Sequence, residues 1–298
     1  MPCQSNFLTP KKRYILLTVG IFILILIIVA SCVLGIYLKS QEETKSWKGN
    51  GTSRNLQEIV LGRCYGYLAK NPNLGERDCN KIWQELTNAV YKKDPCSITE
   101  DSYNNLIKLT QEAIPCNKSL LWSRTNILVH QFTKVREDFT TLEDTFLGSM
   151  FDGLTWCGKT NSAGMNFKSC PAWDECANNS ISSFWKKASA AFAKSSCGVV
   201  QVMLNGSTDG NIVREDSILK SIEIPSMNPD MVSELIIWLM NSPGGGSSNS
   251  CSNKSLVALK EYIEKHKIRS SCKVDYRPVR LLQCIENPGA ADCTTYYY

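Results

Sequence analysis

The sequence predicts a mixed α/β fold: a helix-rich first part, then a part with a short parallel sheet, all behind a single membrane-spanning helix. Three observations predict it. An uncharged run of 25 residues lies near the N-terminus, twelve cysteines follow it, and the apolar pattern changes from helical spacing to short β-branched runs near Cys197. With 298 residues, 43% of them hydrophobic, the chain is long enough to build a core.

The uncharged run covers residues 14–38. A helix of that length crosses the hydrocarbon layer with some tilt, whereas the apolar part of a cleaved signal peptide is shorter. Lys11, Lys12 and Arg13 precede the run, and this basic excess keeps the N-terminus in the cytoplasm. We therefore expect a type II protein of the plasma membrane with a cytoplasmic tail over 1–13, a membrane helix over 14–38, a stalk over 39–54 and an extracellular domain over 55–298.

Cysteine usage agrees with an extracellular domain. Cys3 and Cys32 belong to the tail and the span, and the remaining twelve are an even number. No Cys-x-x-Cys pair occurs and the two histidines, His130 and His266, are far apart, so we expect no metal site. Five Asn-x-Ser/Thr triplets, each weak evidence alone, are candidates for glycosylation and begin at Asn50, Asn117, Asn178, Asn205 and Asn253.

Charge and motifs exclude several classes of function. Residues 1–38 hold three Lys/Arg and no acid, so the net charge of +5 leaves only +2 for the rest, and nothing indicates a nucleic-acid partner. The glycine-rich loops that hold phosphates are absent, as is Gly-x-Ser-x-Gly. With two histidines, a Ser-His-Asp triad is disfavoured as well.

Helical spacing of apolar residues dominates the first two-thirds of the chain. It predicts helices over residues 56–93, 98–113, 141–150 and 182–193.

Later the pattern changes. VVQVML at 199–204 predicts a buried strand that ends at the turn Asn205-Gly206, and SIEI at 221–224 fits a second strand. We expect helices over 231–240 and 256–266, separated by a loop over 243–250. Strands that alternate with helices indicate a small parallel sheet.

The chemistry that remains rests on carboxylates, tryptophans and arginines. Each has a structural explanation that is favoured when the residue is taken singly. Trp122 and Trp185 would be core residues, Glu143 a solvated helix position, and Glu223 the outward position of a strand. Their combination is more informative than any one of them.

Six motifs occur in order among the cysteines: LLWSR (120–124), TLEDT (141–145), LTWCG (154–158), FWKKAS (184–189), VMLNGS (202–207) and SIEI (221–224). In this arrangement the chain, from about Leu61 to Cys293, resembles the ADP-ribosyl cyclase / cyclic ADP-ribose hydrolase family. It is similar to the membrane-spanning members, because its C-terminus, ADCTTYYY, has no hydrophobic anchor signal.

The resemblance implies a helical part over about 55–118 and 144–196, packed on a sheet-containing part over about 119–143 and 197–298. The active cleft would lie between the two parts. It also implies six disulfides, which spacing alone leaves open: Cys64 with Cys79, Cys96 with Cys176, Cys116 with Cys197, Cys157 with Cys170, Cys251 with Cys272 and Cys284 with Cys293.

By resemblance, the substrate is NAD and the first step breaks the bond between nicotinamide and ribose. Nicotinamide in NAD is a pyridinium cation that departs neutral, so one ionised carboxylate is the main requirement, without the acid partner that glycosidases use. Glu223 matches the family's catalytic glutamate and is expected to be charged at neutral pH, with a hydrogen-bonding partner if it is buried. Trp122 and Trp185 match tryptophans that stack on the cationic ring.

The resemblance assigns further roles. Glu143 and Asp152 would receive the nicotinamide carboxamide. Glu143 would also bias the outcome between hydrolysis and cyclisation. Ser123 and Arg124 would contact the diphosphate, and Ser189 would add a hydroxyl donor.

The expected products are nicotinamide with ADP-ribose and cyclic ADP-ribose, and hydrolysis of cyclic ADP-ribose and base exchange on NADP are expected too. No cofactor is required, because NAD is the substrate. A homodimer is compatible with these expectations. Two alternatives stay open: a catalytically weak receptor or adhesion protein on the same scaffold, and a sugar hydrolase, which would need an acid partner for Glu223.

Overall fold

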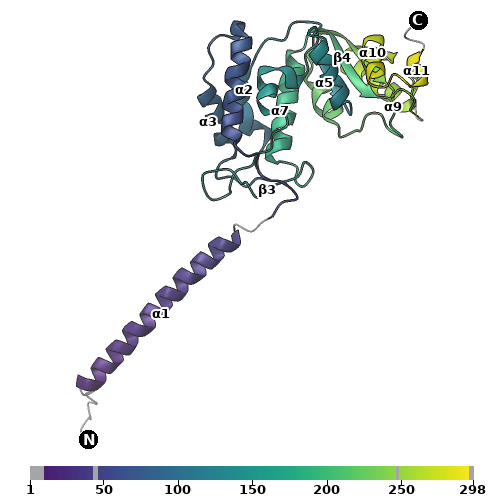
Figure 1. Ribbon diagram of the computed structural model, residues 1–298. Coiled ribbons are helices and arrows are strands. Elements are labelled where there is room, and N and C mark those ends of the chain that lie inside the picture. The colour runs from purple at the N-terminus through teal and green to yellow at the C-terminus, as the bar shows by residue number, and fades with distance from the viewer. Residues whose placement is uncertain (1–9, 43–45, 246–247, 295–298) are drawn as a thin grey trace. The chain divides into compact units, whose positions relative to one another are not determined.

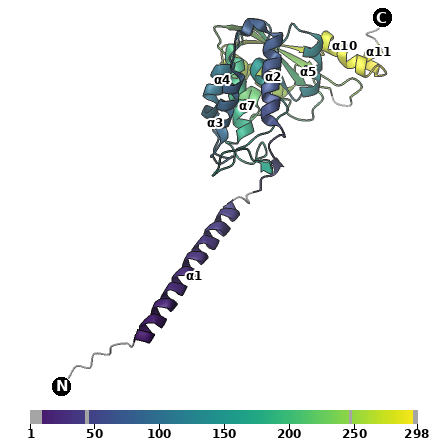
Figure 2. The ribbon, with the colours of Figure 1, turned by 60° about the vertical axis from the view of Figure 1, so that its left-hand side comes forward.

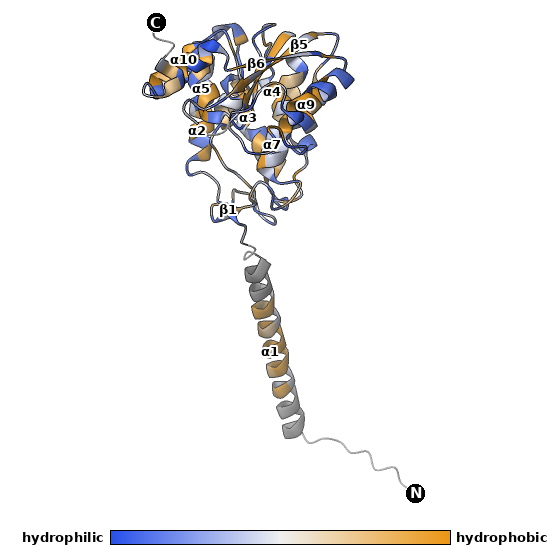
Figure 3. Cartoon of the chain, turned by 90° about the vertical axis from the view of Figure 1, so that its right-hand side faces the viewer, coloured by the Kyte–Doolittle hydropathy of each residue, from blue (hydrophilic) through white to orange (hydrophobic). Residues whose placement is uncertain are grey.

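The computed structural model describes residues 10–42, 46–245 and 248–294, and its two units are described separately. The first contains helix α1 (Pro10–Glu42), which is longer than the span expected over 14–38. Its stretch Thr18–Gly35 has a mean hydropathy of 2.8, and Figure 3 shows an apolar band there. Among the described residues, α1 is the helix whose length and composition suit a membrane span. Most of the expected cytoplasmic tail lies outside the described residues.

The second unit begins at Lys48, ahead of the domain start expected at residue 55. Strand β1 (Gly49–Asn50) pairs antiparallel with β3 (Ser169–Cys170). Thr52 is buried, and its hydroxyl donates to the carbonyl of Cys157 at 3.3 Å. Residues 48–54, which belong to the expected stalk, therefore pack at an edge of this unit, where glycines and small polar residues allow close approach of the backbone.

The helical part contains the helices expected from apolar spacing, with interruptions. The first predicted helix is two helices, because Pro72 and Gly75 break the pattern between them. Figures 1 and 2 show α2, α3, α4 and α7 grouped on one side of this unit. The elements of this part are α2 (Leu56–Lys70), η1 (Pro72–Leu74), α3 (Cys79–Val90), η2 (Glu100–Tyr103), α4 (Asn104–Thr110), η3 (Leu142–Asp144), α6 (Phe146–Phe151) and α7 (Ser180–Ser195).

The sheet has four parallel strands in the order β2-β4-β5-β6. Alternate residues of the strands enter two cores. Val202 and Ile237 join the larger core with the helical part and α9, whereas Met203 and Trp238 join a smaller core against α5 and α10. The elements of this part are β2 (Leu120–Ser123), α5 (Asn126–Val135), β4 (Gly198–Asn205), η4 (Leu219–Glu223), α8 (Ile224–Ser226), β5 (Val232–Met240), α9 (Lys254–Lys265), β6 (Arg269–Val274), α10 (Arg277–Glu286) and α11 (Ala291–Thr294).

Two element predictions are wrong. Residues 231–240, expected to be a helix, contain the inner strand β5. A strand buried on both faces is apolar throughout, and periodicity does not distinguish such a run from a buried helix. SIEI, expected to be a strand, lies instead in the π-helical turn η4 and helix α8. Pro225 fits the first turn of α8, where its missing N–H costs no hydrogen bond.

Six disulfides hold the second unit together, and they are the six pairs that the resemblance implied. The pairs are Cys64–Cys79, Cys96–Cys176, Cys116–Cys197, Cys157–Cys170, Cys251–Cys272 and Cys284–Cys293.

The glycosylation candidates differ in exposure. Asn50, Asn117 and Asn178 are exposed, whereas Asn205 and Asn253 are half-buried. Their glycosylation stays a prediction.

Candidate active site

The motif LLWSR places its polar residues at the carboxyl end of an outer strand. Trp122 and Ser123 end β2, and Arg124 follows in the left-handed region at φ 58°. The guanidinium of Arg124 donates to the carbonyl of Asn211 at 3.1 Å. The carboxyl ends of parallel strands are the usual place for ligands in α/β folds. The turn at Arg124 therefore puts the end of this motif where a substrate can reach it.

Glu143 lies on η3, and the turn that carries it is fixed by its own sequence. Thr141 and Asp144 cap each other: the hydroxyl of Thr141 donates to the Asp144 carboxylate at 2.7 Å, and its backbone N–H donates at 2.9 Å. Of the two acids in TLEDT, Asp144 is thus structural. Glu143 remains available and accepts a hydrogen bond from the indole Nε1 of Trp122 at 3.1 Å.

Burial raises the pKa of Glu143. The hydrogen bond from Trp122 and the nearby His130 oppose this increase, and the negative charge of Asp152 adds to it. Two neighbouring groups therefore shift the pKa of Glu143: His130 on α5 lowers it, and Asp152 just after α6 raises it.

Glu223 is the most strongly perturbed acid of the site. It lies at the end of the π-helical turn and is 7% exposed. Burial is the first cause that raises its pKa, to about 8, and the charge of Glu143 is the second. A hydrogen bond with Ser189 of α7 lowers the pKa in part. π-Turns often occur at functional sites, and this one aims a carboxyl group at the interior.

This environment corrects one expectation. Glu223 was expected to be charged at neutral pH, but a carboxyl group whose pKa is about 8 is mostly protonated there without a ligand. The physical reason is that one hydroxyl partner, Ser189, does not replace the water that burial removes.

The structure brings most of the predicted site residues together. Glu223 is linked to Ser189 by a hydrogen bond and to Glu143 by charge. Trp185 is half-buried one turn before Ser189, so both lie on the same face of α7. The residues that the structure joins through such contacts are Trp122, Glu143, Asp152, Ser189 and Glu223. Ser123 adjoins Trp122 on β2, and the guanidinium of Arg124 is directed to the carbonyl of Asn211 and not to the other predicted site residues.

His130 is a residue of the site that the sequence argument did not select. Its ring meets the Trp122 indole edge-on at 5.8 Å, and its buried Nε2 finds no hydrogen-bond partner among the described residues. Because its electrostatic interaction with Glu143 also lowers the pKa of that acid, His130 belongs to the surroundings of the site. No motif marks it in the sequence, although it is one of only two histidines.

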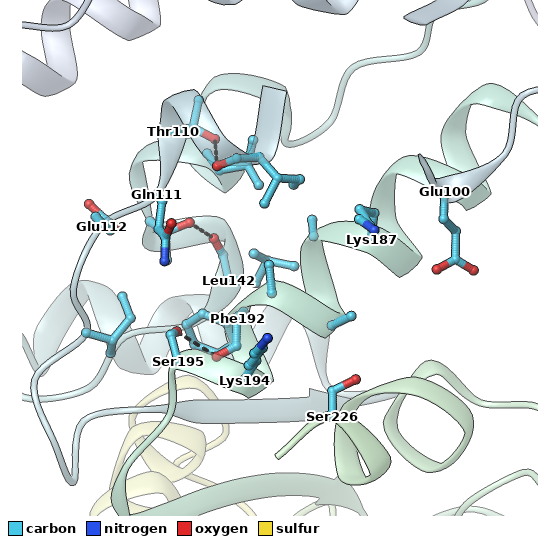
Figure 4. Close-up of a pocket in the computed structure, with 17 residues that line it drawn as sticks. Glu100, Thr110, Gln111, Glu112, Leu142, Lys187, Phe192, Lys194, Ser195 and Ser226 are labelled. Carbon is cyan, nitrogen blue, oxygen red and sulfur yellow. Dashed lines mark hydrogen bonds between the residues drawn. The ribbon is translucent and has the colours of Figure 1, made fainter. Parts of the chain in front are cut away.

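A separate hollow of about 730 Å³ lies between α4, η3 and α7 (Figure 4). Its wall includes Glu112, Leu142, Thr145 and Lys194 but none of the predicted site residues. Leu142 precedes Glu143 directly, so the hollow borders the back of the turn that carries this acid. Within the described parts of the chain, no group of three or more His, Cys, Asp or Glu is arranged to hold a metal ion.

Comparisons with known proteins agree with this geometry. A family model described as ADP-ribosyl cyclase matches residues 53–293. The chain is 42% identical to the rat protein ADP-ribosyl cyclase/cyclic ADP-ribose hydrolase 1 over 83% of its own length and 82% of the relative's. It is 37% identical to the human protein ADP-ribosyl cyclase/cyclic ADP-ribose hydrolase 2, over 83% and 78%.

Solved structures show the same fold. Porcine CD38 with a covalent intermediate, ribo-F-ribose-5'-phosphate, matches with a TM-score of 0.74 and 40% identity, over 78% of this chain and all of that one. Aplysia cyclase complexed with substrate NGD and product cGDPR matches with a TM-score of 0.74 and 29% identity, over 82% and 98%. The matched family model, the curated relatives and the shared fold together show that this chain belongs to the ADP-ribosyl cyclase / cyclic ADP-ribose hydrolase family of enzymes.

Proposed function

We propose that this enzyme cleaves the bond between nicotinamide and ribose in NAD, releasing nicotinamide with ADP-ribose and cyclic ADP-ribose. The observation that carries the proposal is the buried carboxyl group of Glu223, which interacts electrostatically with Glu143. Glu143 in turn accepts a hydrogen bond from the Trp122 indole. Because nicotinamide leaves as a neutral molecule, a single carboxylate under the ribose is sufficient and no general acid is needed. No metal or cofactor is required for this step.

The raised pKa values of Glu223 and Glu143 fit a cationic substrate. Two neighbouring carboxyl groups resist ionisation together while the site is empty. A pyridinium cation bound between them favours their charged forms, and ribose hydroxyls add the hydrogen bonds that Glu223 lacks. Binding of the substrate thus favours release of the Glu223 proton to solvent and generates the carboxylate that attacks the ribose.

Glu223 acts as a nucleophile in this proposal. Porcine CD38 has been solved with a covalent intermediate on a ribose phosphate, which supports the same step here. A carboxylate oxygen of Glu223 bonds to the anomeric carbon while the bond to nicotinamide breaks, and that electron pair leaves with nicotinamide. Water then displaces the carboxylate to give ADP-ribose, or the adenine ring does so to give cyclic ADP-ribose.

The other site residues orient the substrate. Trp122 and Trp185 stack on the nicotinamide ring, which is worth about 1 kcal/mol for each favourable contact. Glu143 and Asp152 receive the carboxamide, and Glu143 biases the intermediate between water and adenine. Ser123 and Arg124 hold the diphosphate. Hydrolysis of cyclic ADP-ribose uses the same intermediate, and base exchange on NADP uses the corresponding intermediate that carries the additional phosphate of NADP.

The location follows from the first unit and the cysteines. The apolar helix α1 and the six disulfides of the second unit are consistent with a type II anchor and an extracellular domain. We therefore place the reaction at the outer face of the plasma membrane.

The test is to incubate the purified protein with NAD in a metal-free buffer and to separate the products by chromatography. Glu223→Gln, which keeps the shape but removes the charge, is expected to fold and to lose at least about a thousandfold in kcat. Glu264→Gln serves as the matched control, because Glu264 is an exposed residue of α9 outside the proposed site, and it should retain activity. Near-normal turnover by Glu223→Gln would refute the assignment.

A further inference from the structure

Helix α6 lies between two acids of the site, Glu143 and Asp152, and its position sets the distance between them. It has only six residues, and a helix of that length is not stable without support from its surroundings. The negative charge of Asp152 raises the pKa of Glu143, so the two carboxylates already interact across this helix. Whatever holds both ends of α6 therefore controls the geometry of the acids.

The N-terminal end of α6 is held by Glu112 and Tyr67. The backbone N–H of Phe146, the first residue of the helix, donates to Glu112 Oε1 at 2.9 Å. The hydroxyl of Tyr67 donates to the carbonyl of Asp144 at 3.1 Å and lies 3.4 Å from Glu112 Oε2. The Tyr67 ring also packs on Phe146, with ring centroids 5.4 Å apart. A carboxylate at the start of a helix is favoured by the helix dipole.

The C-terminal end of α6 is held by Arg63. Its guanidinium Nη1 donates to the carbonyl of Asp152 at 2.7 Å and also lies 3.3 Å and 3.4 Å from the carbonyls of Met150 and Ser149. A cation at this end complements the dipole and satisfies carbonyls that the helix leaves without partners.

Arg63 and Tyr67 are one turn apart on α2, so they project from the same face of that helix and reach the two ends of α6. Helix α2 is itself fixed by the disulfide between Cys64 and Cys79 of α3. Helix α2, which the disulfide anchors to α3, thus holds the short helix α6, and the two site acids flank α6 in the chain.

We propose that Arg63, Tyr67 and Glu112 form a brace that fixes the spacing of Glu143 and Asp152 and thereby sets how the intermediate divides between water and adenine. The three are positioning residues: their side chains contact α6 and its flanks, and the site acids act on the substrate. The inference rests on the proposed function, because Glu143 influences this division only if the enzyme forms the intermediate. A displacement of the site acids well below 1 Å is enough to change the competition between water and adenine for the intermediate, because attack by water and attack by adenine need different geometries.

The test uses the full chain with Tyr67→Phe, which keeps the ring on Phe146 and removes only the hydroxyl. Glu112→Leu removes the acceptor of the Phe146 N–H, and Glu112→Gln restores an acceptor without the charge. Tyr65→Phe is the matched control, because its exposed hydroxyl on the same helix meets Asn80 and not α6.

The readout is the ratio of cyclic to hydrolysed product from NAD. Partial unfolding lowers both products equally and leaves this ratio unchanged, so the ratio separates positioning from stability. We expect Tyr67→Phe and Glu112→Leu to change the ratio by about threefold or more, Glu112→Gln to return it toward the original value, and Tyr65→Phe to leave it unchanged. An unchanged ratio in both Tyr67→Phe and Glu112→Leu overturns the brace.

A second measurement does not depend on activity. Hydrogen exchange of the backbone amides from Phe146 to Asp152 should speed up in Tyr67→Phe and in Arg63→Met relative to Tyr65→Phe. If exchange in this segment is the same in all variants, the brace is refuted, whether or not the protein cleaves NAD. If exchange changes but the wild-type protein does not cleave NAD, the proposed function and the claimed effect on its products fail, and only the clamp on α6 survives.

Discussion

The environment of Glu223 predicts how the stability of the domain depends on pH. The ordinary pKa of a glutamate is 4.5, and burial together with the charge of Glu143 raises that of Glu223 to about 8. Below pH 4.5 the group is protonated in both the folded and the unfolded chain. Between these two values the unfolded carboxyl is ionised while the folded one keeps its proton. The free energy of unfolding therefore falls as pH rises through this window, and the loss is complete above pH 8.

The size of this effect follows from the two pKa values. The difference between 4.5 and about 8 corresponds to a cost on the order of 5 kcal/mol. A typical domain has only about 5 to 15 kcal/mol of net stability, so the cost is large enough to measure. Glu223→Gln has no carboxyl group to titrate at this position and should avoid most of this loss of free energy of unfolding. Glu143→Gln should reduce it in part, because the charge of Glu143 is the second cause of the raised pKa.

The assay is guanidinium unfolding of residues 48–298 with the disulfides intact, measured from about pH 5 to 9. We expect the wild-type domain to lose several kcal/mol more of its free energy of unfolding than Glu223→Gln across this range. The control Glu264→Gln should follow the wild type. Parallel curves for wild type and Glu223→Gln would show that the carboxyl is not buried with a raised pKa.

Two further predictions concern the elements that support the acids. Ser189→Ala removes the hydrogen bond that lowers the pKa of Glu223, so the acidic limb of the kcat/KM profile should move to higher pH. Ser195→Ala on the same helix removes a hydroxyl that donates to the Phe192 carbonyl at 2.8 Å and should not move this limb. Identical profiles for wild type and Ser189→Ala would contradict the role of Ser189. Gly148→Ala should destabilise the domain by about 2 kcal/mol or more in thermal or guanidinium unfolding, because the added methyl would collide with the backbone of Leu142 beside Glu143. Gly62→Ala on α2 has open space and should be neutral or stabilising, and equal stability of both variants would count against close packing at Gly148.

How far the sequence predicts the fold differs from element to element. α1, β4 and α7 follow from local patterns: a long uncharged run, a β-branched run that ends at Asn-Gly, and helical spacing of apolar residues. β5 does not follow from a local pattern, because a strand covered on both faces shows no alternation of polar and apolar residues. SIEI does not either, because Pro225 and the packing of this segment against α7 favour a helical turn. The even number of cysteines indicates disulfides, but their pairing needs the fold or a resemblance to a known family.

For the site, the sequence alone determined the ingredients: which acids and indoles the chain carries and in what order. It also disfavoured a Ser-His-Asp triad, because the chain has only two histidines. Only the tertiary structure decided which of them meet. It set Glu143 against Trp122 and Glu223 against Ser189, added His130, and removed Glu223 from water so that its pKa rises. The physical reason is that local patterns report short-range propensities, whereas burial and the field of neighbouring charges depend on residues that are far apart in the chain.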